Sequence, residues 1–393
     1  MTTAAITHGT NWQDVLEGAI QQAGVNQPAG VSADLALFFA STDYTPHLEA
    51  MVRRVQSATG ATVVAGCSGQ GIIGPEREIE TEPAVSLMTL PLPGASLRGC
   101  HISQEQLQQA GDDVHSWHRL TGVPPEDANA WLMFADPFRL DCEALLGSFS
   151  GAYPGLPIIG GLASGAPSQH VTYVFLNGEV YDHGAVAVAL GGDYTVKTVV
   201  SQGCDPIGEP WIITAANGSI VESISQRPAY EVLVETVRAL PQDTQERASR
   251  NLLVGLAMDE YKDTFGRGDF LIRGLTGADP KSGAIAIGAY PRVGQTVQFQ
   301  IRDATAADED LRQLLGTARE ELGSTKPVGA LLCSCNGRGQ GLFGFPDHDA
   351  RTVAQQLGPV PLAGFFCNGE IGPVGKDIFL HGFTASLALI VPK

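Results

Sequence analysis

Apolar segments and glycine-rich corners follow one another along the chain in a recurring order. An apolar segment long enough for a buried strand is followed by a second one that ends in a small polar residue and a glycine. The first segments are 35–40, 131–137, 252–260 and 329–337, and the second are 63–71, 157–165, 270–278 and 361–369. The closing pairs are Ser68-Gly69, Ser164-Gly165, Thr276-Gly277 and Asn368-Gly369. The sequence therefore predicts one structural unit that occurs four times.

Helical patterns fall between the two strands in three of these units. In the first unit, Leu48, Met51, Val52 and Val55 recur at helical spacing, whereas the third unit has only the glycine-rich link YKDTFGRG. Alternating segments such as TVQFQIRD predict antiparallel strands as well. We expect an α/β (mixed α+β) fold, in which internally repeated strand-helix-strand units form mixed sheets flanked by helices in two lobes.

The length of 393 residues also favours two domains, because a single hydrophobic core rarely serves so long a chain. We place an N-terminal segment at 1–30, a first domain at 31–220 and a second at 221–393. Hydrophobic residues make up 44% and charged residues 17%, which is typical of a packed globular protein.

The net charge of −18, with no basic cluster, argues against nucleic acid and an anionic membrane as partners. The apolar runs are too short for a bilayer, which needs about 20 residues, so we expect no membrane insertion. No Lys or Arg precedes Arg53, so a basic signal-peptide start is absent and a cytoplasmic protein is expected. Seven irregularly spaced cysteines favour reduced thiols over a disulfide framework.

Three C-terminal motifs, GALLCSCNGRGQGLFGFPDHDA, VPLAGFFCNGEIGPVG and FLHGFTASLAL, resemble the C-terminal domain of the FIST family (F-box and intracellular signal transduction proteins). The earlier GCSGQGIIG and PIIGGLASG resemble its N-terminal domain, so 31–220 is similar to FIST N and 221–393 to FIST C. The resemblance implies a sensory domain for signal transduction that binds a small ligand, such as an amino acid. Since no residues remain for an output module, we expect a stand-alone sensor that acts through a separate output protein.

The candidate ligand-binding residues lie at the glycine corners, where strand ends present polar groups and the backbone can approach a ligand. Arg338 can clamp a carboxylate and Glu370 can accept an ammonium group, so the pair suits an amino acid. The full candidate set is Asn336, Arg338, Asn368, Glu370, Arg273, His381, Asp136 and Cys335. For Arg338, a structural salt bridge or loop anchor is an equally good interpretation.

The main alternative is an enzyme of the acyl-transfer or hydrolase class that uses Cys335 or Cys367 as its nucleophile, with His381 as a base. The residues do not decide whether the protein is an enzyme, but they favour ligand binding, and we assign no catalytic residue. We also expect no metal and no cofactor, because Cys333 and Cys335 lack a second Cys or His pair at zinc-site spacing.

Overall fold

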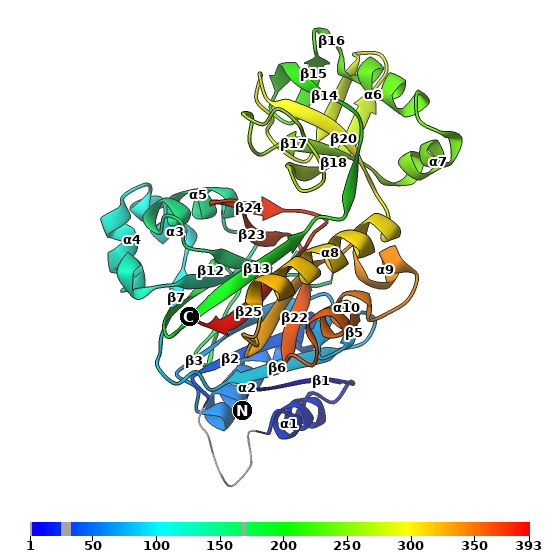
Figure 1. Ribbon diagram of the computed structural model, residues 1–393. Helices are drawn as coiled ribbons and strands as arrows, with labels where there is room; N and C mark the ends of the chain where they lie inside the picture. Colours follow the sequence, from blue (N-terminus) through cyan, green and yellow to red (C-terminus); the bar gives the residue numbers. More distant parts are fainter. Residues whose placement is uncertain (1, 25–32, 167–169) are drawn as a thin grey trace. The chain divides into compact units, whose positions relative to one another are not determined.

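The computed structural model of the protein describes residues 2–24, 33–166 and 170–393 (Figure 1). Its internal contacts divide the chain into two compact units. Residues 1–200 and 312–393 form what we call the core unit, and residues 201–311 form the inserted unit. The inserted unit interrupts the sequence of the core unit, so the core unit is assembled from both ends of the chain.

The core unit contains three repeats with the same order of elements: a strand, helices, a strand, helices, a strand, a hairpin and a last strand. The first repeat comprises β1 (Thr3–His8), α1 (Trp12–Gln22), β2 (Leu35–Ser41), the 3₁₀ helix η1 (Thr42–His47), α2 (Leu48–Thr59), β3 (Val63–Gly69), β4 (Ile72–Gly74), β5 (Arg77–Ile79) and β6 (Ala84–Leu90).

The second and third repeats follow the same plan. The second comprises β7 (Ala95–Ile102), α3 (Gln104–Ala110), α4 (Val114–Thr121), η2 (Pro125–Asp127), β8 (Ala130–Ala135), α5 (Cys142–Ala152), β9 (Ile158–Leu162), β10 (Val174–Leu176), β11 (Glu179–Tyr181) and β12 (Ala185–Gly192). The third comprises β13 (Tyr194–Ser201), α8 (Ala304–Leu322), β21 (Gly329–Cys335), α9 (Gly339–Phe343), α10 (His348–Leu357), β22 (Leu362–Cys367), β23 (Glu370–Val374), β24 (Asp377–His381) and β25 (Ala385–Pro392). Of α8, the residues from Arg312 onward belong to the core unit.

Each repeat forms most of one six-stranded mixed sheet. The strand orders are β1-β6-β2-β3-β10-β11, β7-β12-β8-β9-β23-β24 and β13-β25-β21-β22-β4-β5. In every sheet the two central strands are parallel, namely β2 with β3, β8 with β9 and β21 with β22. The predicted strand-helix-strand unit is this parallel pair with the helix between its strands, as expected for a parallel connection.

The hairpin of each repeat leaves its own sheet and completes the sheet of another repeat. Strand β4 of the first repeat pairs with β22 of the third, and β10 of the second pairs with β3 of the first. Strand β23 of the third repeat pairs with β9 of the second. The exchange is cyclic, so all three repeats interlock and no sheet is complete without a segment from elsewhere in the sequence.

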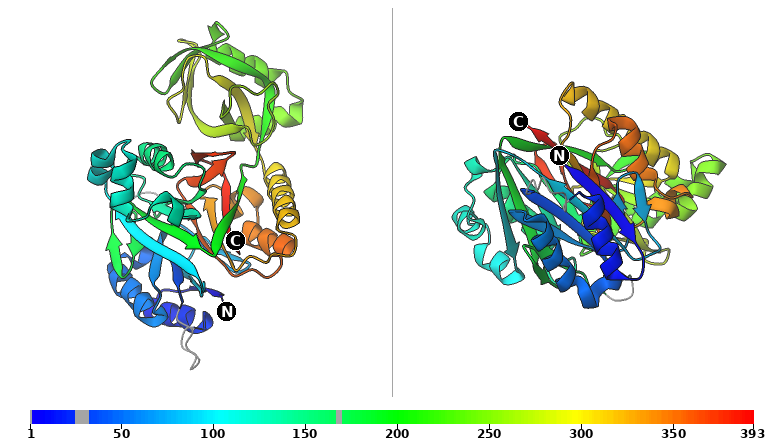
Figure 2. Two further views of the ribbon diagram at one scale, coloured as in Figure 1. Left: turned by 60° about the vertical axis from the view of Figure 1, so that its left-hand side comes forward. Right: turned by 90° about the horizontal axis from the view of Figure 1, so that it is seen from below.

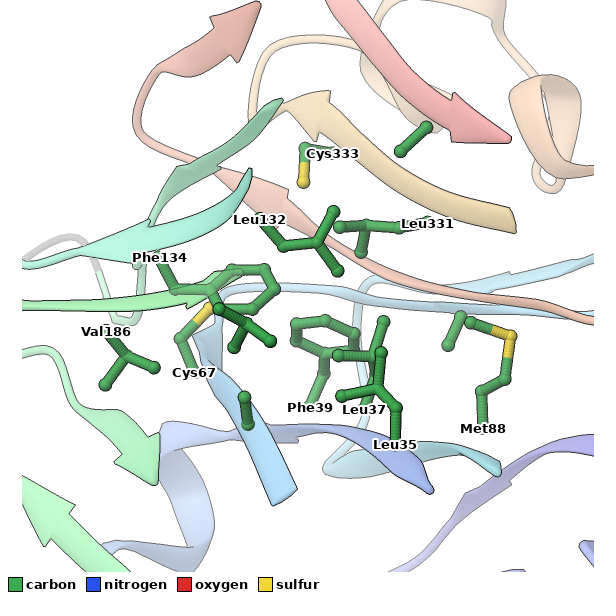
Figure 3. Packing of buried hydrophobic residues seen from close by; sticks show 14 of the residues in the cluster. Leu35, Leu37, Phe39, Cys67, Met88, Leu132, Phe134, Val186, Leu331 and Cys333 are labelled. Atoms are coloured by element: carbon green, nitrogen blue, oxygen red, sulfur yellow. The ribbon is translucent and has the colours of Figure 1, made fainter. Parts of the chain in front are cut away.

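The inner faces of the three sheets share one hydrophobic core, to which alternate residues of the central strands contribute (Figure 3). Three fully buried phenylalanines, one from each sheet, meet there: Phe39, Phe134 and Phe365. Their ring centroids are 5.4 Å (Phe39 to Phe134), 5.0 Å (Phe39 to Phe365) and 6.1 Å (Phe134 to Phe365) apart. Burying each ring contributes about 2 kcal/mol or more to the stability of this junction.

Helices cover the outer faces of the sheets. Helices α1 and α2 lie together on the first sheet (Figure 2). Their apolar stripes pack with Phe38 and Phe175. On the second sheet, α4 and α5 enclose an aromatic cluster in which Phe149 lies 5.3 Å from Trp117 and 4.9 Å from Trp131. The predicted mixed sheets flanked by helices are therefore confirmed.

The inserted unit is a separate antiparallel barrel with two helices. Its elements are β14 (Cys204–Asn217), β15 (Ile220–Ile224), β16 (Arg227–Pro228), α6 (Ala229–Arg238), α7 (Gln242–Asn251), β17 (Leu252–Ala257), β18 (Phe270–Asp279), β19 (Ala284–Ile287) and β20 (Thr296–Arg302). The strand order is β14-β20-β17-β18-β19-β15-β16, and β14 also pairs with β15. That additional pairing closes the sheet into a ring (Figure 2), whose interior holds Val254, Ile285 and Phe299.

The prediction of four equivalent units is wrong for the third of them. Strands β17 and β18, which correspond to 252–260 and 270–278, pair antiparallel within the barrel. Their link lacks a helix, and a parallel return would need a crossover of a dozen or more residues that is usually helical. The unit therefore occurs three times.

One glycine on the second parallel strand of each repeat marks the three equivalent positions. Gly66, Gly160 and Gly364 lie opposite Phe38, Met133 and Leu332 in the register of the parallel pairs. A Cβ atom at these glycines would lie 1.8, 1.9 and 1.9 Å from the carbonyl oxygen of the opposing residue. Any side chain would force the central strands apart.

We expect Gly160→Ala to lower the free energy of unfolding of the core unit by about 3 kcal/mol or more, because the clash is with backbone and no rotamer relieves it. The matched control is Gly147→Ala in α5, where an added Cβ meets nothing within 4 Å. Alanine is the better helix former, so the control is expected to gain up to about 1 kcal/mol. Urea denaturation of both variants measures the difference, and equal midpoints would contradict the proposed close approach.

Candidate functional site

The corners that follow the second parallel strands meet one another in the core unit. Counting from Gly66, Gly160 and Gly364, the residues at the same position in each corner are Gln70, Ser164 and Asn368. The sequence pattern matched Ser68 with Ser164, but the residue of the first corner that corresponds to Ser164 is Gln70, two residues further along the chain. The first corner contains two polar-glycine pairs in a row, Ser68-Gly69 and Gln70-Gly71, and the sequence pattern alone did not show which of them corresponds to Ser164-Gly165.

Hydrogen bonds join the three corners in a closed ring. The amide of Asn368 donates to the carbonyl of Leu162, and the amide of Ser164 donates to that of Ser68, each at 3.1 Å. At the third junction a side chain intervenes: the amide of Gln70 donates to Ser164 Oγ at 2.7 Å, and Ser164 Oγ donates to the carbonyl of Phe366. Three of the four predicted corners are therefore brought together.

Two pockets open beside this ring, and Gln70 lines both. The first, of about 300 Å³, is also lined by Glu80, Asn336, Gln340 and Phe366, and we call it the Glu80 pocket. The second, of about 390 Å³, is also lined by Phe138, Gly165, His170 and Asn368. Each volume suits a small organic molecule.

Two of the predicted site residues, Asn336 and Asn368, form the link between these pockets. Asn336 Nδ2 donates to Asn368 Oδ1 at 2.9 Å, and Asn368 Nδ2 donates to the carbonyl of Ala163 at 3.0 Å. Because one amide lines each pocket, the pair is placed to contact a ligand in either. The half-buried Cys335 lies next to them, and its sulfur accepts a hydrogen bond from the amide of Gly337 at 3.5 Å.

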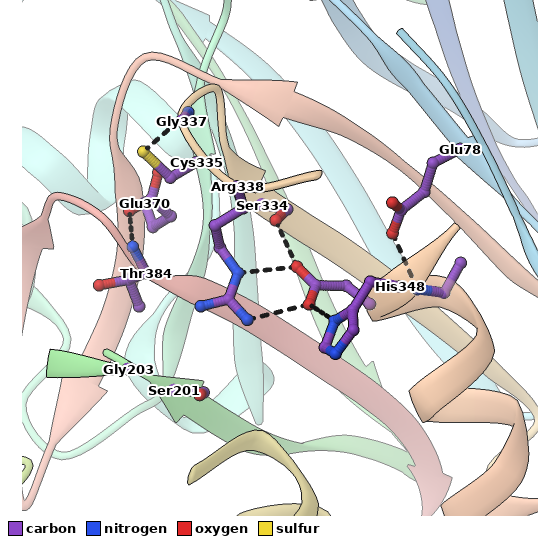
Figure 4. A network of polar contacts seen from close by, with 12 residues as sticks. Glu78, Ser201, Gly203, Ser334, Cys335, Gly337, Arg338, His348, Glu370 and Thr384 are labelled. Atoms are coloured by element: carbon purple, nitrogen blue, oxygen red, sulfur yellow. Dashed lines mark hydrogen bonds and ion pairs between the residues drawn. The ribbon is translucent and has the colours of Figure 1, made fainter. Parts of the chain in front are cut away.

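Arg338 lies inside the protein rather than in a pocket. Only 1% of the residue is exposed, and its guanidinium makes a two-point ion pair with the fully buried Asp349 (Figure 4). The Nε–Oδ2 distance is 2.7 Å and the Nη2–Oδ1 distance is 2.9 Å. This is the structural salt bridge that the sequence left open, and the guanidinium edge suited to a ligand carboxylate faces Asp349 instead.

Asp349 is the centre of a larger buried network in the third repeat. Ser334 Oγ donates to Asp349 Oδ2 at 2.8 Å, and His348 Nδ1 lies 2.9 Å from Oδ1. Burial alone would raise the pKa of this carboxyl, but the charge of Arg338 and the hydrogen bonds from Arg338 and His348 hold it well below its usual range. Asp349 therefore stays ionised and neutralises Arg338.

The exchanged hairpin brings a second buried carboxyl to this network. Glu78 of β5 is 3% exposed; its Oε1 accepts a hydrogen bond from the amide of Ala350 at 2.9 Å. Its own amide donates to Asp347 Oδ1 at 2.8 Å, which ties the hairpin of the first repeat to α10 of the third. Burial raises the pKa of Glu78 to about 8, and the charge of Asp349 adds to the rise.

Glu370 and His381 are neighbours on the exchanged hairpin β23–β24, where they pair in register. Glu370 is fully buried; its Oε1 accepts a hydrogen bond from Cys367 Sγ at 3.1 Å and its Oε2 accepts one from the amide of Thr384 at 2.9 Å. His381 is 3% exposed, and its Nε2 lies 3.1 Å from the carbonyl oxygen of Gly372. Glu370 thus joins the hairpin to the residues on either side of it, whereas the His381 contact lies within the hairpin; neither side chain lines the two pockets described above.

The remaining two predicted residues lie elsewhere. Asp136 is fully buried at the end of β8, where its Oδ1 accepts hydrogen bonds from the amides of Phe138 (3.0 Å) and Arg139 (2.6 Å). It shapes the turn that presents Phe138 to the second pocket. Arg273 belongs to β18 of the inserted unit and donates to the carbonyl of Ile272 at 3.0 Å. A ligand-binding role for any of the eight residues remains a prediction.

The cysteine chemistry proposed from the sequence meets an unfavourable environment at Cys367. The thiol is fully buried and donates to the carbonyl of Ser334 at 3.3 Å and to Glu370 Oε1. Burial raises the pKa of Cys367 well above its usual value, and the charge of Glu370 adds to the rise. A nucleophilic cysteine needs the opposite, a thiolate stabilised by nearby positive charge.

Of the residues that line the Glu80 pocket, the sequence-based candidate set contained only Asn336; it missed Gln70, Gly71, Glu80, Thr81, Gln340, Gly341 and Phe366. Gln70 is recognisable as the counterpart of Ser164 and Asn368 once the repeats are aligned on Gly66, Gly160 and Gly364. Glu80 carries no local signal, because it reaches the third repeat only through the exchanged hairpin. Among the described residues, no three His, Cys, Asp or Glu side chains are close enough to hold a metal ion.

Comparison with known proteins shows that the chain belongs to the FIST family. Residues 34–227 match the FIST N domain and residues 229–373 match the FIST C domain. The two matched segments meet inside the inserted unit, whereas the compact core unit takes residues from both.

Relatives of similar length occur in mycobacteria. An uncharacterised protein of Mycobacterium tuberculosis is 41% identical over 372 residues, which is 92% of each chain. An uncharacterised protein of Mycobacterium bovis is 37% identical over 382 residues, which is 96% of each chain. The crystal structure of a cyanuric acid hydrolase from A. caulinodans aligns over the whole of both chains with a TM-score of 0.36 and 10% identity, too weak a similarity to carry an argument.

No helix in the described parts of the chain combines the length and the apolar character that a membrane crossing requires.

Replacing Arg338 tests the buried ion pair. We expect Arg338→Ala to lower the free energy of unfolding by about 3–5 kcal/mol, because it leaves the Asp349 charge buried without its partner. Arg351→Ala is the matched control: Arg351 pairs with Asp347 at 2.8 Å, but its side chain is 55% exposed. The Asp347 side chain is only 9% exposed, but solvent around Arg351 screens the pair, which is therefore expected to contribute about 1 kcal/mol or less. Similar urea midpoints for the two variants would contradict the buried role.

The raised pKa of Glu78 predicts a specific dependence of stability on pH. Between the ordinary value of 4.5 and about 8, folded Glu78 keeps a proton that the unfolded chain releases. Stability is therefore expected to fall as the pH rises through this window, by up to about 1.4 kcal/mol per pH unit. The low pKa of Asp349 acts in the opposite direction, but only at acid pH below this window.

Glu78→Gln removes the titration and is expected to flatten this slope. The control is Glu76→Gln, an exposed position in the turn of the same hairpin. Urea midpoints at several pH values between about 5 and 8 measure the slopes. A wild-type slope equal to that of Glu78→Gln would show that the carboxyl is ionised in the folded protein.

Proposed function

We propose that this FIST protein is a sensor in signal transduction that binds a small molecule, such as an amino acid, at the ring of corners. The observation that carries the proposal is the pair of pockets that share Gln70 and are linked by Asn336 and Asn368. Backbone amides, side-chain amides and small residues converge there, as they do at ligand sites on strand ends.

The interlocked repeats support a sensory role. The Glu80 pocket is lined by the corner of the first repeat and by the loop after β21 of the third. A ligand there contacts two repeats at once, so its binding energy can favour one arrangement of those segments over another. Such a shift would be passed on to a separate output protein.

The acyl-transfer alternative is less well supported by the geometry. The Cys367 thiol keeps its proton and donates a hydrogen bond to Glu370, and Nε2 of His381, the predicted base, lies at the carbonyl of Gly372. Neither arrangement activates a thiol. Cys335 is half-buried and its sulfur accepts a hydrogen bond from the amide of Gly337, so it can serve as a packing residue of the corner.

A thermal-shift screen against the amino acids tests the proposal. A ligand present at 100 times its dissociation constant is expected to add about 2.7 kcal/mol of stability. Gln70→Ala removes an exposed side chain shared by both pockets, so it is expected to fold normally and to reduce the shift. Gln109→Ala, an exposed glutamine on α3, is the control and should leave the shift unchanged. A hit that is insensitive to Gln70→Ala would place binding elsewhere.

A further inference from the structure

Glu80, just after the exchanged strand β5, is held in a fixed position by the third repeat. Its Oε1 accepts a hydrogen bond from the amide of Gln340 at 2.8 Å. Its carboxylate also lies against the α-carbon of Gly339, where an added Cβ would meet Glu80 Oε2 at 2.5 Å. The glycine-rich stretch after β21 thus accommodates a carboxylate from the protein itself, and that carboxylate lines the pocket.

The negative charge of Glu80 is not neutralised by a neighbouring cation. Arg338 is paired with Asp349, and Arg351 with Asp347. Within the described part of the chain Glu80 has no ion-pair partner, and the other residues that line the pocket carry no ionisable side chain. The pocket therefore has a negative potential that favours a positively charged occupant.

The protonation behaviour of Glu80 agrees with this picture. Burial raises the pKa of its carboxyl; the Gln340 amide opposes the rise, and the charges of Asp349 and Asp347 add to it. A cation bound beside Glu80 would favour the ionised form again.

A second acceptor of the pocket is also unused. Asn336 lines the pocket and donates through Nδ2 to Asn368, but its buried Oδ1 accepts no hydrogen bond from the described residues. An ammonium group carries three donors and no acceptor, which suits two acceptors of this kind. The ring of Phe366 offers an apolar wall for a short hydrocarbon chain.

We infer that the Glu80 pocket binds its ligand through a primary ammonium group, with Glu80 as the charged partner and Asn336 Oδ1 as a second acceptor. The inference rests on the proposed function and narrows it to a class of ligand. Because no cation lines the pocket, a free carboxylate on the ligand has no charged partner there. A primary amine therefore binds more tightly than the amino acid of the same chain length.

Three probes with the same four-carbon chain test the assignment: 1,4-diaminobutane, 4-aminobutanoate and succinate. Isothermal titration of the full chain is expected to give the tightest binding for the diamine, weaker binding for the amino acid and none for succinate. The Glu80→Gln variant is expected to bind the diamine at least about tenfold more weakly, because it loses a charged hydrogen bond. Glu82→Gln, at an exposed glutamate two residues further on that does not line the pocket, leaves the affinity unchanged.

If Glu80→Gln does not fold, wild-type titrations at increasing salt replace it, because added salt weakens an ion pair. Binding of succinate as tight as that of the diamine, an unchanged affinity in Glu80→Gln, or no binding of any probe overturns the assignment. The ammonium assignment can fail while the proposed function stands. An amino acid whose binding needs Gln70 but not Glu80 would overturn the assignment alone.

Discussion

The exchange of hairpins among the three repeats is the constraint on which the core unit depends. Each hairpin completes a sheet that its own repeat did not begin, so the sheets can form only together. The contacts involved are far apart in sequence: the amide of Ala350 bonds to Glu78 across 272 residues. Such pairings bring loop-closure costs, which only the completed core with its buried aromatic junction can offset.

The exchange also explains why polar groups are buried near the corners. A hairpin that joins the sheet of another repeat has backbone amides and carbonyls at its ends that the strand pairing does not satisfy. Buried groups of this kind must be hydrogen-bonded. Ser164 supplies the missing link between Gln70 and Phe366, and Glu370 accepts from the amide of Thr384. Several polar residues that a sequence reader would assign to a ligand thus satisfy the backbone instead.

Local sequence patterns therefore predicted the helices and strands well, but they did not predict which distant residues contact one another. The helical stripe of Leu48, Met51 and Val55 and the apolar strands gave the parallel pairs correctly, because both depend on neighbours a few residues away. The antiparallel return of β18 was missed, since the pattern of 252–278 resembles the other units except for its link. Asn336 and Asn368 were both assigned to the site because each follows a central strand. No local pattern shows that Arg338 pairs with Asp349 or that Glu80 contacts Gly339.

The sign of the charge in the Glu80 pocket follows from this same interlocking. The sequence left two interpretations of Arg338 open: a two-point clamp for a ligand carboxylate, and a structural salt bridge or loop anchor. In the folded protein Asp349 neutralises Arg338 and Asp347 pairs with Arg351, while Glu78 is protonated below a pH of about 8. The charge that remains belongs to Glu80, delivered by the hairpin of another repeat. The exchange that completes the sheet thus also determines which kind of ligand the pocket can attract.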